Sequence, residues 1–178
     1  TVSEKIHKKY ANQFSKITGL NKILIRTWEN RYNFLAPKRS STNIRIYDND
    51  MLNKGIKYSI LVKSGHKISK LVKSSEEELN ILIEKTLEGS QDTHIKESVF
   101  ISRFIQSALS FDADLFDRTY NICTKELGLV AFYKNVLIAT MNKISILYLN
   151  SKITCANEHF LSEQIRIKIA QEISKEHH

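Results

Sequence analysis

Beyond residue 75 the apolar residues recur with the spacing of amphipathic helices. Ser75 and Glu78 have the spacing of a capping box, which predicts that a helix begins there. We expect helices over 76–88, 93–110, 112–128 and 129–149, and one from residue 155 onward. In the last of these an apolar residue recurs every four positions: Leu161, Ile165, Ile169 and Ile173. This repeat predicts a stripe that is buried against a core, and the set of helices predicts a helical bundle.

The residues before position 75 give a mixed pattern. Two short helical segments meet at Thr18-Gly19, and the second is expected over roughly 21–30. After the Ser-Ser-Thr-Asn stretch the chain alternates apolar and polar residues up to Tyr47, which predicts a small β-hairpin. Asp48 can then cap the next helix. A helix, a turn, a second helix and a hairpin form the layout of a winged helix-turn-helix, whose second helix enters the major groove.

The formal net charge of +8 is divided unevenly along the chain. Residues 1–74 hold 16 Lys+Arg against 4 Asp+Glu, which gives +12, whereas residues 75–178 hold 11 against 15, which gives −4. This distribution is typical of a nucleic-acid-binding module joined to a second module, although a solvated basic surface is the alternative reading.

The candidate DNA contacts follow from this layout. Asn21 and Lys22 stand at the start of the second helix, where Asn can pair with adenine and Lys can donate to guanine. Asn21 could equally cap the helix. The residues placed to meet phosphates are Arg26, Arg31, Lys38, Arg39 and Arg45.

The aromatic and acidic residues of this region have structural readings. We expect Trp28 and Tyr32 to pack in the core first of all, and Tyr47 to lock the hairpin. Glu29 is expected to form an internal salt bridge because it stands among so many cations.

The same residues form a signature that resembles the MerR superfamily. It reads Arg26-x-Trp28-Glu29-x-Arg31-Tyr32, then Pro37, Arg39, Asn43-x-Arg45 and Tyr47, and the resemblance covers about residues 10–72. The resemblance implies that Arg26, Arg31 and Arg39 grip backbone phosphates, and that Arg45 does so from the wing. Tyr32 and Asn43 belong to the signature and are included in the expected DNA-binding surface.

The second half resembles the helical bundle of MerR regulators that carry a cobalamin-binding module, the light-responsive repressors of the CarH and LitR type. Residues 109–116 look like the bundle segment of that branch, and Glu158-His159-Phe160 looks like its Glu-His-Phe motif. The resemblance implies that the bundle caps adenosylcobalamin, with Glu158 and His159 near the upper face of the cobalt and His159 as a candidate ligand. Tyr148 stands where the branch has a tryptophan that covers the adenosyl group.

The downstream corrin-binding domain of that branch, with its Asp-x-His-x-x-Gly motif, is not found in these 178 residues. We therefore expect that the chain is a piece of a longer protein, and that only the complete protein binds cobalamin.

Without the resemblance, Glu158 and His159 have a simpler reading. Glu158 falls on the predicted apolar stripe, where a carboxylate needs a partner, and both residues could form a hydrogen-bonded pair in the first turn of a helix. Cys155 and His159 have the spacing of two metal ligands, but two ligands do not make a zinc site. The two cysteines of the chain do not form a disulfide framework.

The sequence thus predicts a mainly α protein with a winged helix-turn-helix over 1–74, a helical linker over 75–93 and a four-helix bundle over 94–178. We expect a bacterial, cytoplasmic transcription regulator that binds promoter DNA as a dimer or tetramer, under light or ligand control, most simply as a repressor. No apolar run approaches the length of a membrane span, and no enzymatic motif is found. The alternatives are a bundle that binds another ligand or a protein, and an architectural DNA-binding protein without a ligand.

Overall fold

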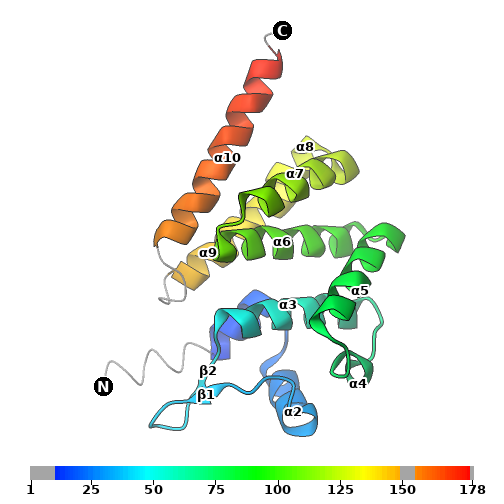
Figure 1. The fold of residues 1–178 in the computed structure, drawn as a ribbon, viewed down its shortest axis with the longest axis vertical. Helices are drawn as coiled ribbons and strands as arrows, with labels where there is room; N and C mark the ends of the chain where they lie inside the picture. Colours follow the sequence, from blue (N-terminus) through cyan, green and yellow to red (C-terminus); the bar gives the residue numbers. More distant parts are fainter. Residues whose placement is uncertain (1–10, 149–154, 177–178) are drawn as a thin grey trace. The chain divides into compact units, whose positions relative to one another are not determined.

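The computed structural model describes residues 11–148 and 155–176, and the chain divides into two compact units, Thr1–Ser102 and Arg103–His178 (Figure 1). Helices dominate both units, and the sheet that the described residues contain is one antiparallel pair of short strands. The predicted mainly α class is confirmed. Within the described residues, no helix is both long and apolar enough to cross a membrane.

The elements follow one another with short connections. A helix that includes residues 11–18 comes first. The others are α2 (Lys22–Tyr32), β1 (Lys38–Arg39), β2 (Arg45–Ile46), α3 (Asn49–Lys63), α4 (Ile68–Leu71), α5 (Glu76–Gly89), α6 (Thr93–Ser110), α7 (Ala113–Leu127), α8 (Leu129–Ala131), the π-helix η1 (Phe132–Leu137), α9 (Ile138–Tyr148) and α10 (Cys155–Glu176).

Side-chain caps fix where several helices begin. The Asp48 carboxylate accepts a hydrogen bond from the Met51 amide at 2.9 Å, as the sequence predicts. Ser75 and Glu78 form the predicted capping box, in which each side chain accepts a hydrogen bond from the backbone amide of the other residue. These caps satisfy amides that a helix leaves unpaired at its start, so local sequence alone sets both boundaries.

An aromatic core holds the first unit together. The Phe14 ring stacks on Tyr47 at 4.2 Å between centroids, and Phe34 lies between Trp28 at 5.5 Å and Tyr58 at 4.6 Å. The expectation that Trp28 belongs to the core is confirmed. These pairs join the helix of residues 11–18, α2, α3 and the hairpin into one packed unit.

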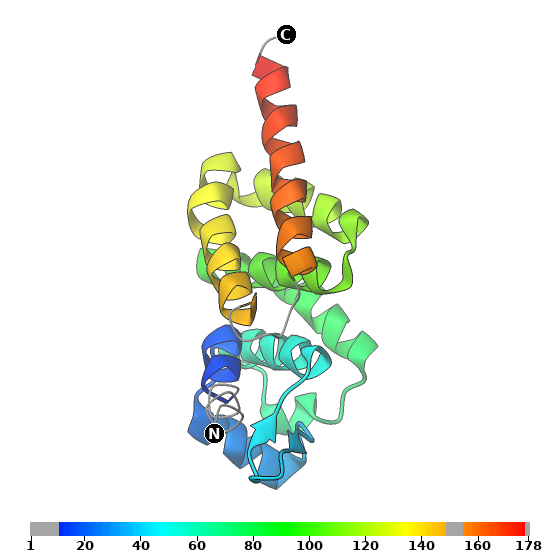
Figure 2. The same ribbon diagram turned by 90° about the vertical axis from the view of Figure 1, so that its left-hand side faces the viewer.

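Gly55 lets α3 approach the helix of residues 11–18, which lies beside it in Figure 2. A Cβ at this position would lie 2.7 Å from the Phe14 ring and 2.8 Å from the methyl carbon of Thr18, closer than van der Waals contact permits. The close approach therefore requires glycine.

In its described residues, the second unit consists of the end of α6, α7, the continuous run α8–η1–α9, and α10. Asp112 caps α7 by accepting from the Leu115 amide at 2.8 Å, and Gly128 ends it with a φ of 85°. Phe104 packs on Phe116 and Phe132 at 5.0 and 5.6 Å, which places the core among α6, α7 and η1. The predicted helix over 129–149 contains the π-helical turns of η1, which apolar periodicity did not indicate.

The predicted apolar stripe on α10 is wrong in its C-terminal half. Leu161 is fully buried, but Ile169 and Ile173 are exposed. Lys168 is buried in their place, with its ammonium 3.0 Å from the Asp117 carboxylate. The side of α10 that faces α7 carries Lys168 and Glu172 there, and the Tyr120 hydroxyl donates to Glu172 at 3.3 Å, so Ile169 and Ile173 lie at the edge of this contact. Figure 2 shows the C-terminal end of α10 extending past the other helices of the unit.

Candidate functional site

Helix α2 presents the side chains expected to meet DNA. Asn21 caps it, because its carbonyl oxygen accepts a hydrogen bond from the Ile23 amide at 2.8 Å. The side-chain oxygen of Asn21 therefore caps the helix, which is one of the two roles left open for this residue. Its side-chain NH₂ group remains as a hydrogen-bond donor. Ile25 and Trp28 face the core, whereas Lys22 and Arg26 are exposed.

A carboxylate joins α2 to the hairpin. The Arg45 Nε donates to Glu29 Oε2 at 2.5 Å, and the Tyr47 hydroxyl donates to Glu29 Oε1 at 2.6 Å. Burial, and then the hydrogen bond to Glu29, raise the pKa of Tyr47 well above its ordinary range, so the hydroxyl stays protonated and can donate. The predicted internal salt bridge of Glu29 is confirmed. We call Glu29, Arg45 and Tyr47 the wing clamp.

The tip of the hairpin is braced by its own side chains. Residue Arg39 pairs with Arg45 across the two strands, and its guanidinium donates to the side-chain oxygen of Asn43 at 2.9 Å. Asn43 has a positive φ of 62°, a conformation that asparagine tolerates better than most residues. The predicted hairpin is confirmed, with Arg45 on it.

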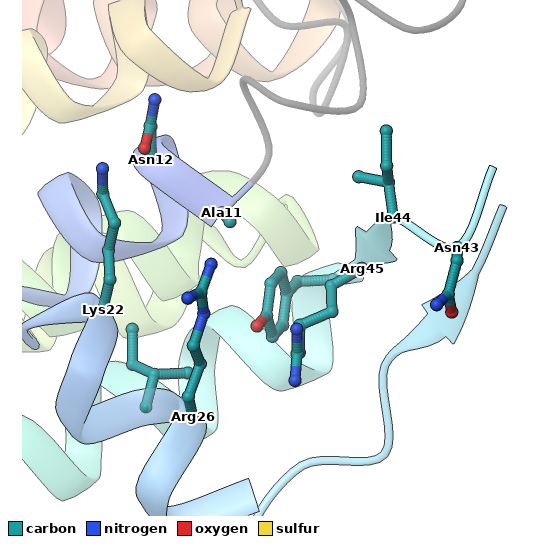
Figure 3. Close-up of a pocket in the computed structure, with 9 residues that line it drawn as sticks. Ala11, Asn12, Lys22, Arg26, Asn43, Ile44 and Arg45 are labelled. Carbon is teal, nitrogen blue, oxygen red and sulfur yellow. The ribbon is translucent and has the colours of Figure 1, made fainter.

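The cations of α2 and the hairpin meet at one pocket of about 400 Å³ (Figure 3). Figure 3 shows Lys22 and Arg26 rising from α2 on one side and Arg45 and Asn43 on the other. Its lining residues are Ala11, Asn12, Lys22, Ile25, Arg26, Asn43, Ile44, Arg45 and Tyr47. Of these, Lys22, Arg26, Asn43 and Arg45 were predicted contacts. Ala11 and Asn12 were not, because the sequence alone does not bring the first helix to the hairpin.

The other predicted contacts lie outside the lining of this pocket. Arg31, Lys38 and Arg39 are exposed, and Tyr32 is half-buried. Their exposure leaves them available to the phosphates on either side of a groove.

In the second unit, a buried asparagine anchors the start of α10. The Asn157 side chain donates to the backbone oxygen of Ala108 at 2.8 Å, at the end of α6. Phe160 packs edge-on against Phe111, with 5.8 Å between the ring centroids. These two contacts fix the first turns of α10 against the end of α6.

Glu158 and His159 lie on the outer side of this anchored turn. Glu158 is half-buried rather than interior, and its carboxylate accepts a hydrogen bond from the Ser162 hydroxyl at 2.9 Å. The His159 side chain is 72% exposed, with Nδ1 3.8 Å from Glu158 Oε2. The imidazole is therefore open to a group that approaches the unit from outside. The side chain of Tyr148 lies outside the described residues.

Comparison with family models assigns both units. The model described as MerR HTH family regulatory protein matches residues 11–73, which include α2 and the wing clamp. The model described as B12 binding domain matches residues 101–171, which include Glu158 and His159. A MerR HTH domain followed by a B12 binding domain matches a MerR-family regulator with a cobalamin-binding module. No curated protein matches the chain well enough to serve as a relative.

The B12 binding domain indicates cobalamin binding. The residues at the start of α10 fit such a group. An exposed imidazole nitrogen is a good ligand for a transition metal, and the exposed Phe111 ring offers an apolar surface close by. Among the described residues, no group of three or more His, Cys, Asp or Glu side chains could hold a separate metal ion.

Proposed function

We propose that the MerR domain docks α2 in the major groove of promoter DNA, with the hairpin on the adjacent backbone. The observation that carries this proposal is the convergence of Lys22, Arg26 and Arg45 on one pocket between α2 and the hairpin. Three cations from two elements form one basic surface that can meet the charged backbone, which dominates affinity in complexes with DNA.

The individual roles follow from the partners of each side chain. Lys22 is exposed in the first turn of α2, where it can donate to a guanine edge. The free NH₂ of Asn21 is a second donor in the same turn. The phosphate contacts are assigned to Arg26, Arg31, Lys38, Arg39 and Arg45, with Tyr32 and Asn43 at the edge of the surface.

The test is selection of operator sequences from random duplexes by the full chain, followed by the ratio of the affinities for the selected and random DNA. A regulator is expected to prefer its operator by about 10³-fold or more at physiological salt. A ratio near one would contradict the proposal and would indicate an architectural DNA-binding protein. Lys85→Ala, an exposed cation on α5, serves as the matched control for Lys22→Ala.

We propose further that the bundle covers the upper face of adenosylcobalamin, with His159 toward the cobalt and Glu158 beside it. The exposure of His159 and the anchoring of its turn by Asn157 support this role. Bound adenosylcobalamin would supply a light-sensitive cobalt–carbon bond and hence a signal. The residues of α10 orient the imidazole, and the Phe111 and Phe160 rings exclude water beside it.

The absorption spectrum of the complete native protein tests the cap. The protein is incubated with adenosylcobalamin in the dark, desalted and then illuminated. We expect a retained corrin spectrum that changes on illumination, and an altered spectrum in His159→Ala. His94→Ala, which removes an exposed histidine from the first unit, is the control. An unaltered spectrum in His159→Ala would refute the assignment of this residue.

We also propose that the regulator acts as a dimer or tetramer and represses transcription under the control of this signal. One winged helix makes few base contacts, and a two-fold pair doubles them across paired half-sites. The exposed Ile169 and Ile173 of α10 offer an apolar surface to a second copy of the chain. Ile169→Lys with Ile173→Lys is expected to lower the molar mass measured by light scattering; an unchanged mass would exclude α10 as the contact.

A second candidate is a regulator whose bundle has exchanged cobalamin for another ligand or a protein partner. Tyr148, in the position of the family tryptophan, favours it, because a tyrosine covers less area than a tryptophan. Failure of the complete protein to retain a corrin, with operator selection intact, would decide for this candidate.

A further inference from the structure

Helix α2 carries an isoleucine at the centre of its outward face. At about 100° per residue, Ile23 points nearly opposite to the direction shared by Ile25 and Trp28, which are buried. The Ile23 side chain is 74% exposed, more than any other large apolar side chain among the described residues. It therefore contributes little to the packing of the unit.

Thr27 extends this apolar spot by one turn. Thr27 is exposed, and its hydroxyl donates to the backbone oxygen of Ile23 at 2.8 Å. Because the hydroxyl is engaged with the backbone, the methyl group is the free end of the side chain. Lys22 and Arg26, both exposed, flank the two apolar groups on the same helix.

Single exposed apolar residues are common on protein surfaces and mostly carry no function. Ile23 differs in its position, because it lies in the first turn of the helix that the wing clamp holds beside the cationic pocket. In this docking geometry the N-terminal residues of the helix approach the base edges. The apolar group on those edges in the major groove is the C5-methyl of thymine.

We infer that Ile23, together with the methyl group of Thr27, is a specificity-determining contact to thymine methyl groups in the major groove. The inference rests on the proposed DNA-binding function and adds to it a preference that the charged residues cannot supply. Each half-site contains thymine where it faces the first turn of α2, and burial of Ile23 against the methyl is favourable because apolar surface leaves water.

Uracil provides the direct test, because it pairs like thymine and lacks only the methyl group. Operator duplexes are first selected by the full chain from a random library. Uracil then replaces thymine one position at a time, and Kd is measured by fluorescence anisotropy. At the contacted positions we expect Kd to rise about fourfold for each methyl removed. Ile23→Ala should bind the thymine duplex more weakly than the unchanged chain does. Replacing thymine with uracil at the same positions should then raise the Kd of this variant no further.

Two variants sharpen the result. Thr27→Ser keeps the hydroxyl and removes the methyl group of Thr27. With this variant, uracil should no longer raise Kd at the position that Thr27 contacts, and should still raise it at the position that Ile23 contacts. Ile81→Ala removes an exposed isoleucine from α5 and should behave like the unchanged chain.

The outcomes separate this inference from the function on which it rests. If the operator is still preferred, with unchanged Kd, when uracil replaces thymine at every position, the inference is overturned and the proposed function as a regulator is unaffected. An Ile23→Ala chain that is as sensitive to uracil as the unchanged chain also overturns it. If no sequence is preferred over random DNA, both the inference and the proposed function fail.

Discussion

Replacing Glu29 with alanine should loosen the wing without replacing a residue that is proposed to contact DNA. Glu29 accepts hydrogen bonds from Arg45 and from Tyr47, and only 6% of its side chain is exposed. Removing it leaves the buried Tyr47 hydroxyl without an acceptor and Arg45 without its anion. The hairpin is then attached to α2 by packing alone.

The magnitude follows from these two bonds. A hydrogen bond to a charged group contributes about 1.5–3 kcal/mol. The Arg45 guanidinium remains partly exposed, with 20% of its side chain in contact with water, and recovers part of its loss by hydration. We therefore expect Glu29→Ala to cost about 3 kcal/mol of unfolding free energy. Glu29→Gln keeps an oxygen for Tyr47 and should cost about half as much.

Trp28 is the only tryptophan of the chain and is buried in the first unit, so its fluorescence reports the unfolding of this unit in urea. At a slope of about 1.5 kcal/mol per molar urea, the midpoint of Glu29→Ala should fall by about 2 M. Glu88→Ala, at an exposed position on α5, should change the stability by less than about 0.5 kcal/mol. A Glu29→Ala midpoint as high as that of the Glu88 control would refute the reasoning.

Three further predictions follow from the same contacts. Arg45→Ala should weaken operator binding and lower the slope of log Kd against log salt by about one; an unchanged slope would remove Arg45 from the phosphate contacts. Asn157→Ala should lower the free energy of unfolding by about 1–2 kcal/mol, because it removes the side-chain donor to the Ala108 carbonyl. In a Cys155→Ser background, it should also speed the labelling of the buried Cys123 by a thiol reagent. Equal labelling rates with and without the Asn157 side chain would contradict its role as an anchor of α10. Burial raises the pKa of Tyr58 to about 12 and that of Tyr47 further, so both hold their protons in the folded chain above pH 10, where the unfolded chain releases them. The free energy of unfolding should therefore be constant up to about pH 10 and fall as the pH rises toward 12. Urea unfolding measures it, and phenolate absorbance in parallel follows the ionisation of tyrosine. A free energy of unfolding that does not fall over this range would contradict the raised pKa values of the two tyrosines.

Features that depend on a few neighbouring residues were predictable from the sequence. The Asp48 cap and the Ser75–Glu78 capping box appear where the pattern placed them. Each depends on one side chain and the backbone within four residues, so no knowledge of the fold is needed. The MerR signature was readable for the same reason, since its residues lie within one short stretch.

Features that depend on the neighbours of an element were not predictable. Ile169 and Ile173 continue the repeat of Leu161, yet the side of α10 that faces α7 carries Lys168 and Glu172 instead. A repeat shows which residues share a face and leaves open whether anything packs there. The exposure of Ile23 was missed for the related reason that the outward direction of α2 is set by the burial of Ile25 and Trp28.

The most direct test of the account is the affinity of the complete native protein for its selected operator, with adenosylcobalamin in the dark and after illumination. The account predicts tight binding with the ligand in the dark and weaker binding after light. Equal affinity with ligand, without ligand and after illumination would contradict the proposed coupling between the bundle and the DNA-binding domain.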